Sequence, residues 1–229
     1  GVRLVGSEMC IRDRLLPYIS SERYIRLLRY VHAADRKLAL YSELLTRMII
    51  LSHTSLTINN LQFYYKENHK PILLTDPSID FSYSHTKGAI LCCVSTDSTV
   101  GTDIEICEDA PYQIMNIAFH PTEIEYITTP SEVQKAKRFY KIWTQKEAYT
   151  KRCGIGLACD LTKINTLESS IVSSLYCWEI GNYICSICGN FTSLPIVHYI
   201  SEKDIFDFFH PYTPNLSLIH ISEPTRRTP

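Results

Sequence analysis

The sequence predicts an α+β protein built from two similar lobes. Each half of the chain shows helical periodicity followed by a run of strand-like segments, and the pattern restarts after residues 96–99. With 229 residues, 45% of them hydrophobic, the chain can form one large domain or two small ones with an ample core. No repeat is visible at residue level, so we expect the lobes to share an architecture rather than a sequence.

The two ends of the chain differ from the rest. Residues 1–14 and 218–229 resemble translated sequencing-adapter sequence and continue no periodicity of their neighbours. Natural disordered tails are the alternative explanation. We therefore expect an N-terminal lobe at residues 15–98 and a C-terminal lobe at residues 99–217.

The N-terminal lobe is expected to begin with two helices. Ser20 or Ser21 can cap the first, whose apolar stripe runs from Tyr24 to Val31, and the second covers residues 34–52. Extended segments are then expected at Leu61–Tyr65, Lys70–Leu73, Phe81–His85 and Ala89–Ser95.

The C-terminal lobe repeats this order after an opening strand. Proline at position 121 suits the first turn of a helix, and Gly154 suits the end of a long one. Helices are expected at Tyr112–Ala118, Pro121–Ile127 and Ser131–Cys153, and strands at Val100–Cys107, Thr162–Thr166, Leu175–Ile180, Tyr183–Cys188 and Ile196–Ile200.

Composition narrows the range of possible functions and locations. A net charge of −1 gives no general attraction to nucleic acid or membranes. The longest apolar run, Leu44–Leu51, is too short to span a bilayer, and the residues before Leu15 lack the apolar centre of a signal peptide. Nine scattered cysteines suggest free thiols in a reducing cytoplasm. The lone pair Cys185 and Cys188 has no partner pair for zinc, so we interpret it as buried strand cysteine.

A group of acidic residues carries the chemistry. Asp103 and Glu105 lie two apart on a strand and share one face, while Glu147 and Lys151 lie four apart on a helix and share one face. Paired acids are often only a solvated strand face, but this strand is otherwise apolar. Three converging carboxylates would repel one another without a cation. Oxygen donors alone indicate Mg²⁺ or Mn²⁺, and Mg²⁺ commonly shares its ligand shell with substrate phosphates.

Basic and hydroxyl residues suggest a phosphate site upstream. Ser84, His85 and Gly88 at a strand end can hydrogen-bond a phosphate through side chains and backbone N–H groups. Any one lysine or arginine is more often a surface charge than a ligand. A lone Ser-His pair could also indicate a hydrolase, but no serine lies in a Gly-x-Ser-x-Gly elbow.

Together, the motifs over residues 19–200 resemble the Sfp-type 4′-phosphopantetheinyl transferase family. Singly they are weak, but their order along the chain makes the set specific. In the N-terminal half, His69-Lys70-Pro71 matches the family's Gly-Lys-Pro, and Phe81 to Thr86 matches Phe-Asn-x-Ser-His-Ser. In the C-terminal half, three family motifs are matched: Gly-x-Asp-x-Glu by Val100 to Glu105, Phe-x-x-x-Glu by Phe119 to Glu123, and Trp-x-x-Lys-Glu-x-x-x-Lys by Trp143 to Lys151.

The resemblance implies a pseudo-dimer of two α+β lobes with the active site in the cleft between them. It implies coenzyme A as the donor, a serine of an apo acyl or peptidyl carrier protein as the acceptor, and adenosine 3′,5′-bisphosphate as a product. We expect a cytoplasmic monomer that binds neither nucleic acid nor membranes.

The resemblance also assigns roles to individual residues. Asp103, Glu105 and Glu147 would bind the metal, and Lys151 the pyrophosphate. Glu147, a water molecule or Glu123 would take the proton of the acceptor serine. The expected coenzyme A contacts are Lys70, Ser84, His85, Arg47 and Arg23, whereas Leu38 is apolar where the family has a basic residue.

Two other functions are compatible with parts of the pattern. A metal-dependent nuclease also uses Asp-x-Glu with a lysine, but usually on a strand, and this chain lacks a broad basic surface. A non-catalytic carrier-binding module would be expected to lack one acidic ligand, and all three are present. A final expectation is that the N-terminal lobe lacks its proper first strand, or pairs a poor substitute there, because adapter-like sequence occupies residues 1–14. A well-ordered strand at residues 2–11 would contradict it.

Overall fold

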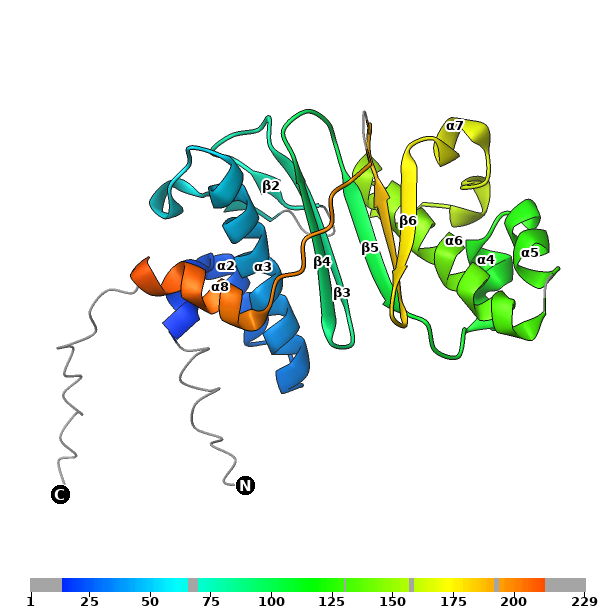
Figure 1. Ribbon diagram of the computed structural model, residues 1–229, viewed down its shortest axis with the longest axis horizontal. Helices are drawn as coiled ribbons and strands as arrows, with labels where there is room; N and C mark the ends of the chain where they lie inside the picture. Colours follow the sequence, from blue (N-terminus) through cyan, green and yellow to red (C-terminus); the bar gives the residue numbers. More distant parts are fainter. Residues whose placement is uncertain (1–13, 66–69, 130, 157–158, 192–193, 213–229) are drawn as a thin grey trace, which may run out of the picture.

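The computed structural model describes residues 14–65, 70–129, 131–156, 159–191 and 194–212. These residues form two α+β lobes that lie side by side (Figure 1). The predicted α+β class with two lobes is therefore confirmed. The expectation of a missing first strand falls on residues 2–11, which lie outside the described residues.

The N-terminal lobe packs helices against two antiparallel pairs of strands. Ser20 caps the first helix, since its side chain accepts a hydrogen bond from the Arg23 backbone N–H. The longer helix α3 packs against the hairpin of β3 and β4 (Figure 1). The elements are η1 (Leu16–Tyr18), α2 (Ser21–Leu27), α3 (Ala33–His53), η2 (Ile58–Asn60), β1 (Phe63–Tyr64), β2 (Ile72–Leu73), β3 (Asp80–Thr86) and β4 (Ala89–Ser95).

The C-terminal lobe packs one long helix on a three-stranded antiparallel sheet of order β5-β7-β6. Helix α6 ends at Gly154, whose φ of 68° is the left-handed conformation that favours glycine. The elements of this lobe are β5 (Gly101–Ile106), η3 (Tyr112–Ile114), α4 (Met115–Ala118), α5 (Pro121–Thr128), α6 (Glu132–Cys153), η5 (Leu161–Lys163), α7 (Ser169–Val172), β6 (Leu175–Ile180) and β7 (Tyr183–Cys188). Two further elements, α8 (Glu202–Phe209) and η6 (His210–Tyr212), follow in the chain.

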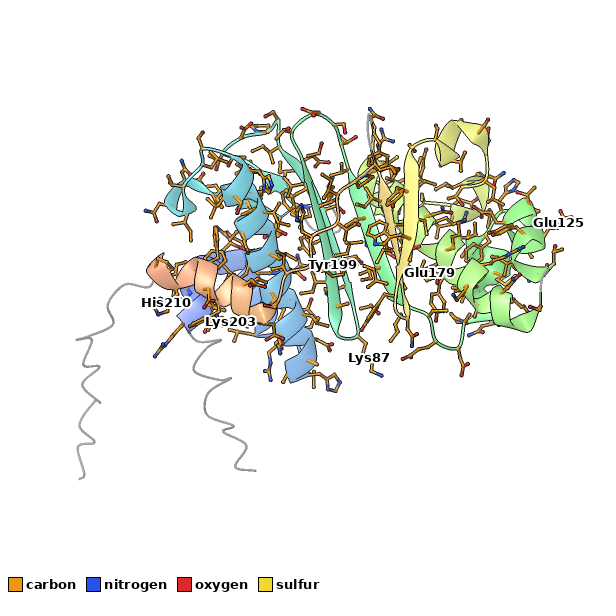
Figure 2. The ribbon with its side chains drawn as sticks, viewed as in Figure 1. Lys87, Glu125, Glu179, Tyr199, Lys203 and His210 are labelled. Carbon is orange, nitrogen blue, oxygen red and sulfur yellow. The ribbon has the colours of Figure 1, made fainter. Side chains whose placement is uncertain are left out.

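Two predicted strands are absent from the described residues. At 162–166, the Asp160 side chain accepts from the Thr162 backbone N–H, and this cap starts the short helix η5 instead. Residues 196–200 pair with no strand that the structure describes. They cross from the C-terminal lobe to the N-terminal one, as the position of Tyr199 shows in Figure 2.

The end of the described chain returns to the N-terminal lobe. Ile205 and Phe209 of α8 join the core formed by Leu15, Tyr18 and Leu44, and Tyr18 stacks on Phe209 with ring centroids 5.1 Å apart. The assignment of all of residues 99–217 to the C-terminal lobe is corrected accordingly. An amphipathic helix of eight residues must bury its apolar face, and α3 supplies the partner surface (Figure 1).

The lobes meet where β3 of one runs beside β5 of the other (Figure 1). The two strands belong to separate sheets, so this seam is not part of a continuous backbone ladder. Within the described ranges, no helix is both long enough and apolar enough to cross a bilayer.

Candidate active site

Glycine at position 101 brings β5 and α6 into direct contact. A Cβ atom at this position would lie 1.9 Å from the carbonyl oxygen of Ala148 and 2.4 Å from the Arg152 nitrogen. Only glycine therefore permits the observed approach. The close packing places the carboxylates of β5 opposite the side chains that α6 presents.

Lys151 lies at the centre of a cluster drawn from both lobes. Its ammonium donates to Asp103 Oδ1 at 2.7 Å and to Ser84 Oγ at 3.0 Å, and lies 3.5 Å from Glu147 Oε2. The Ser84 hydroxyl donates in turn to Asp103 Oδ1 at 2.6 Å. Four of the residues expected from the sequence are thus brought together across β3, β5 and α6.

The acids of this cluster resist ionisation. Burial raises the pKa of Asp103 and of Glu147. Burial, together with the neighbouring charges of Asp103 and Glu147, raises the pKa of Glu105 to about 7. Burial alone would lower the pKa of Lys151, but Asp103 and Glu147 raise it, so the ammonium stays charged. The cluster therefore favours a bound cation.

The donor atoms suit a hard divalent metal ion. Asp103 is 2% exposed, and its Oδ2 atom is buried without a hydrogen-bond partner. Such an unpaired oxygen is costly unless a cation or donor meets it. However, no three His, Cys, Asp or Glu side chains in the described part of the chain already stand close enough to hold a metal. The oxygen set fits Mg²⁺ by type, while Lys151 bridges two of its members.

His85 and Arg23 lie near this cluster on the N-terminal side. Partial burial, followed by the charges of Arg23 and Lys151, lowers the pKa of His85. Arg23 itself is buried, with its guanidinium 5.3 Å from the centre of the Tyr83 ring and its Nε donating to the Ala39 carbonyl at 3.1 Å. The charges of Arg23 and Lys151 therefore both act on the region around His85 and favour its neutral imidazole.

Lys70 and Arg47 are already paired with acids. Lys70 donates to Asp80 and, at 2.6 Å, to the carbonyl of Val100. Arg47 donates to Glu43 Oε1 from Nε at 2.9 Å and from a terminal nitrogen at 2.8 Å. Arg47 also lines a cavity of 760 Å³ in the N-terminal lobe, whose lining includes none of the cluster around Lys151.

Sequence reasoning missed Glu43, the buried acid that organises this part of the lobe. It accepts hydrogen bonds from Arg47, from the Ser20 backbone N–H at 2.8 Å and from the Tyr65 hydroxyl at 2.8 Å. The available signal was a single acid within the apolar run that extends from Ala39 to Leu45.

Glu123 lies in a different environment from the other expected acids. Its Oε1 accepts from the Thr166 backbone N–H at 2.7 Å and hydroxyl at 2.8 Å. Its Oε2 accepts from the His120 backbone N–H at 2.8 Å and pairs with Lys146 at 2.8 Å. Because both oxygens are occupied and the residue is fully buried, this geometry favours a structural anchor over a base.

Comparison with known proteins places the chain in a family. A model of the 4′-phosphopantetheinyl transferase superfamily matches residues 99–188, and a model of the N-terminal part of a 4′-phosphopantetheinyl transferase matches residues 12–97. The chain belongs to the Sfp-type 4′-phosphopantetheinyl transferases. These enzymes transfer phosphopantetheine to carrier proteins.

Several transferases of this family resemble the chain along much of its length. The transferase gsp of Aneurinibacillus migulanus is 27% identical over 77% of this chain and 78% of its own length. Sfp of Bacillus subtilis is 27% identical over 65% of this chain and 66% of its own. A transferase of Bacillus pumilus is 30% identical over 66% of this chain and 64% of its own. The chain thus spans about two thirds or more of these relatives.

Proposed function

We propose that this chain transfers 4′-phosphopantetheine from coenzyme A to a serine of an apo acyl or peptidyl carrier protein and releases adenosine 3′,5′-bisphosphate. The observation that carries the proposal is the cluster of Lys151, Asp103, Ser84 and Glu147 at the seam between the lobes. We take this seam as the active-site cleft.

The acidic residues of the seam would hold the metal. Asp103, Glu105 and Glu147 supply oxygen ligands for Mg²⁺, or for Mn²⁺ in its place. Bound there, the metal would neutralise negative charge on the pyrophosphate as the bond to the leaving phosphate breaks. Lys151 would bind the same pyrophosphate, since its side chain is 27% exposed and can be reached from solvent.

Glu147 is the preferred base for the acceptor serine, directly or through water. Burial raises the pKa of its carboxyl, which makes it a stronger base than an exposed glutamate. Glu123 is the less suitable candidate, because protein donors already occupy both of its oxygens. Positioning and charge neutralisation would still supply most of the rate, since any carboxylate is a weak base for a hydroxyl.

The nucleotide end of coenzyme A would lie towards Ser84, His85 and Arg23, with His85 at its 3′-phosphate. Lys70 and Arg47 remain candidate contacts, but Asp80 balances the charge of Lys70, and Glu43 forms ion pairs with both Arg47 and Arg23. We further propose a cytoplasmic monomer, and the free thiols of the described cysteines are compatible with a reducing compartment.

The decisive experiment is incubation with coenzyme A, Mg²⁺ and apo carrier proteins, followed by intact-mass measurement of the carrier. We expect a gain of one phosphopantetheine group on a fatty-acid, polyketide or peptide-synthetase carrier. Absence of any gain with all three classes would refute transfer. Nicking of a supercoiled plasmid under the same conditions would instead support the nuclease alternative.

The matched variants are Asp103→Ala and Asp207→Ala. Loss of Asp103 should lower kcat/KM by about 10³-fold or more, because a lost metal ligand removes several kcal/mol of charge stabilisation. Among the residues that the structure describes, Asp207 pairs with Lys203 on the exposed surface of α8, so its variant should transfer normally. Full activity in Asp103→Ala would make the metal assignment wrong.

A further inference from the structure

Alternate residues of β3 form a polar row that faces β5. Side chains two apart on a strand share one face, and on this face β3 carries Asp80, Ser82, Ser84 and Thr86. We call these four residues the polar row. The opposite face is different in character, since Phe81 belongs to the apolar core of the N-terminal lobe and Tyr83 packs against it.

Each member of the polar row hydrogen-bonds a residue on or just before β5. Two members accept from backbone groups: Asp80 from the Val100 N–H at 2.7 Å and Ser82 from the Thr102 N–H at 3.0 Å. The other two donate to carboxylates. Ser84 reaches Asp103 Oδ1 at 2.6 Å, and Thr86 reaches Glu105 Oε2 at 3.0 Å.

These side chains replace the backbone ladder that would normally align neighbouring strands. Because β3 and β5 belong to separate sheets, the polar row sets how far β5 can slide along β3. Both ends of the seam are also fixed. Lys70 donates to Asp80 and to the Val100 carbonyl, and Tyr183 of β7 donates to the Lys87 carbonyl at 3.0 Å, at the hairpin tip seen in Figure 2.

Asp103 and Glu105 depend on the polar row to different degrees. Asp103 has a second donor in Lys151, so loss of Ser84 would leave it anchored. Among the described residues, the Glu105 carboxylate accepts from Thr86 alone. A glutamate has three side-chain torsions, and a single hydrogen bond can decide which way its carboxylate points.

We propose that Thr86 is a positioning residue for the cation site, through which the N-terminal lobe orients a carboxylate of the C-terminal lobe. The inference rests on the metal assignment of the proposed function. Partners that hold a metal ligand without touching the metal commonly alter metal affinity by about 10- to 100-fold when removed. Thr86 is not among the residues assigned above to the metal or to coenzyme A, and its hydroxyl donates to Glu105, so its effect would pass through Glu105.

The test is Mn²⁺ binding to the full chain, followed by electron paramagnetic resonance of the free ion, without coenzyme A or carrier. Thr86→Val keeps the side-chain shape and should weaken binding about 10-fold. Thr86→Ser restores the hydroxyl and should restore affinity. Thr128→Val is the matched control, since the Thr128 hydroxyl donates to the Ile124 carbonyl on a distant helix, and it should bind normally.

A double variant separates positioning from general destabilisation. On a Glu105→Gln background, Thr86→Val should cause no further loss of Mn²⁺ affinity, because the carboxylate it orients is already gone. A further loss, or unchanged affinity in Thr86→Val alone, would overturn the inference while leaving the metal site intact. Absence of Mn²⁺ binding by the unmodified chain would overturn the metal assignment and the inference together.

Discussion

Two lysines of α6, five residues apart, show how one helix serves two purposes. Lys146 is 1% exposed and its ammonium is enclosed by Glu123 and the carbonyls of Leu161 and Ile164. Lys151 is 27% exposed and contacts two carboxylates and a hydroxyl. A five-residue step turns about 140° around a helix, so the two side chains face different surroundings.

The two sites differ in how their charges balance. Glu123 and Lys146 form a closed pair, and burial lowers the pKa of Lys146 despite its partner. Around Lys151, the three carboxylates of Asp103, Glu105 and Glu147 face a single ammonium, and burial raises the pKa of each acid. A balanced, fully bonded pair stabilises structure, whereas an excess of buried acid with an unpaired oxygen is suited to a ligand.

Removing each lysine should test this distinction most strongly. Lys146→Met leaves the Glu123 carboxylate buried without a counter-ion, and we expect the free energy of unfolding to fall by about 3–5 kcal/mol. Lys151→Met should reduce stability much less but abolish the mass gain of the carrier. Urea denaturation and the transfer assay measure the two effects.

Lys137→Met provides the matched control for both lysine variants. Lys137 forms an exposed ion pair with Glu179 at 2.7 Å, and exposed pairs often contribute nothing measurable. Neither stability nor transfer should change. Equal losses of stability in the Lys146 and Lys151 variants would contradict the proposal that the pair of Lys146 and Glu123 is structural whereas the cluster around Lys151 serves a ligand.

The close contact between β5 and α6 offers a second test of the cluster around Lys151. Gly101→Ala would force the strand away from the Ala148 carbonyl, and we expect a loss of about 3 kcal/mol in stability together with loss of transfer. Gly189→Ala is the control, because its Cβ would meet side chains rather than backbone: the Phe191 ring at 3.2 Å and Val100 Cγ1 at 3.4 Å. Normal transfer by Gly101→Ala would show that the cluster tolerates a wider spacing.

The raised pKa of Glu105, in the cluster around Lys151, predicts a smaller, pH-dependent effect on stability. Because the pKa of Glu105 is raised to about 7 in the fold, the folded state holds an extra proton between about pH 4.3 and pH 7. Stability without metal should therefore decrease as the pH rises through this range. Mg²⁺ should stabilise the protein more at pH 8 than at pH 6, because it needs the ionised carboxylate.

Thermal unfolding at constant ionic strength, with and without Mg²⁺, measures this dependence. Glu105→Gln removes one titrating group and should reduce the slope between pH 5 and pH 7, while Asp103 and Glu147, whose pKa values are also raised by burial, continue to contribute. A slope unchanged in this variant would show that the pH dependence arises elsewhere.

Local spacing explains why much of the candidate site could be predicted. Residues two apart on a strand or four apart on a helix share a face whatever the surroundings, so Asp103 with Glu105 and Glu147 with Lys151 follow from the sequence. The two strands of the β3–β4 hairpin are expected from the sequence as extended segments, and the structure pairs them through a turn at Gly88, which adopts a φ of 78°.

Tertiary contacts decided the rest. Glu123 looks like a further catalytic acid in the sequence, and only packing shows that Thr166, His120 and Lys146 already occupy its oxygens. The return of α8 to the N-terminal lobe was equally hidden, because an amphipathic helix specifies that a face is buried but not which surface buries it.

The sequence by itself determined the two α+β lobes, the family and the faces that carry the acids, because periodicity and motif order are local properties. Only the tertiary structure decided which lysine meets which acid and which hydroxyls of β3 hold β5. Such pairings join residues far apart in the chain: Ser84 and Asp103 are 19 positions apart, and Asp103 and Lys151 are 48 apart. Such distances close only when helices and sheets pack, so no local pattern encodes them.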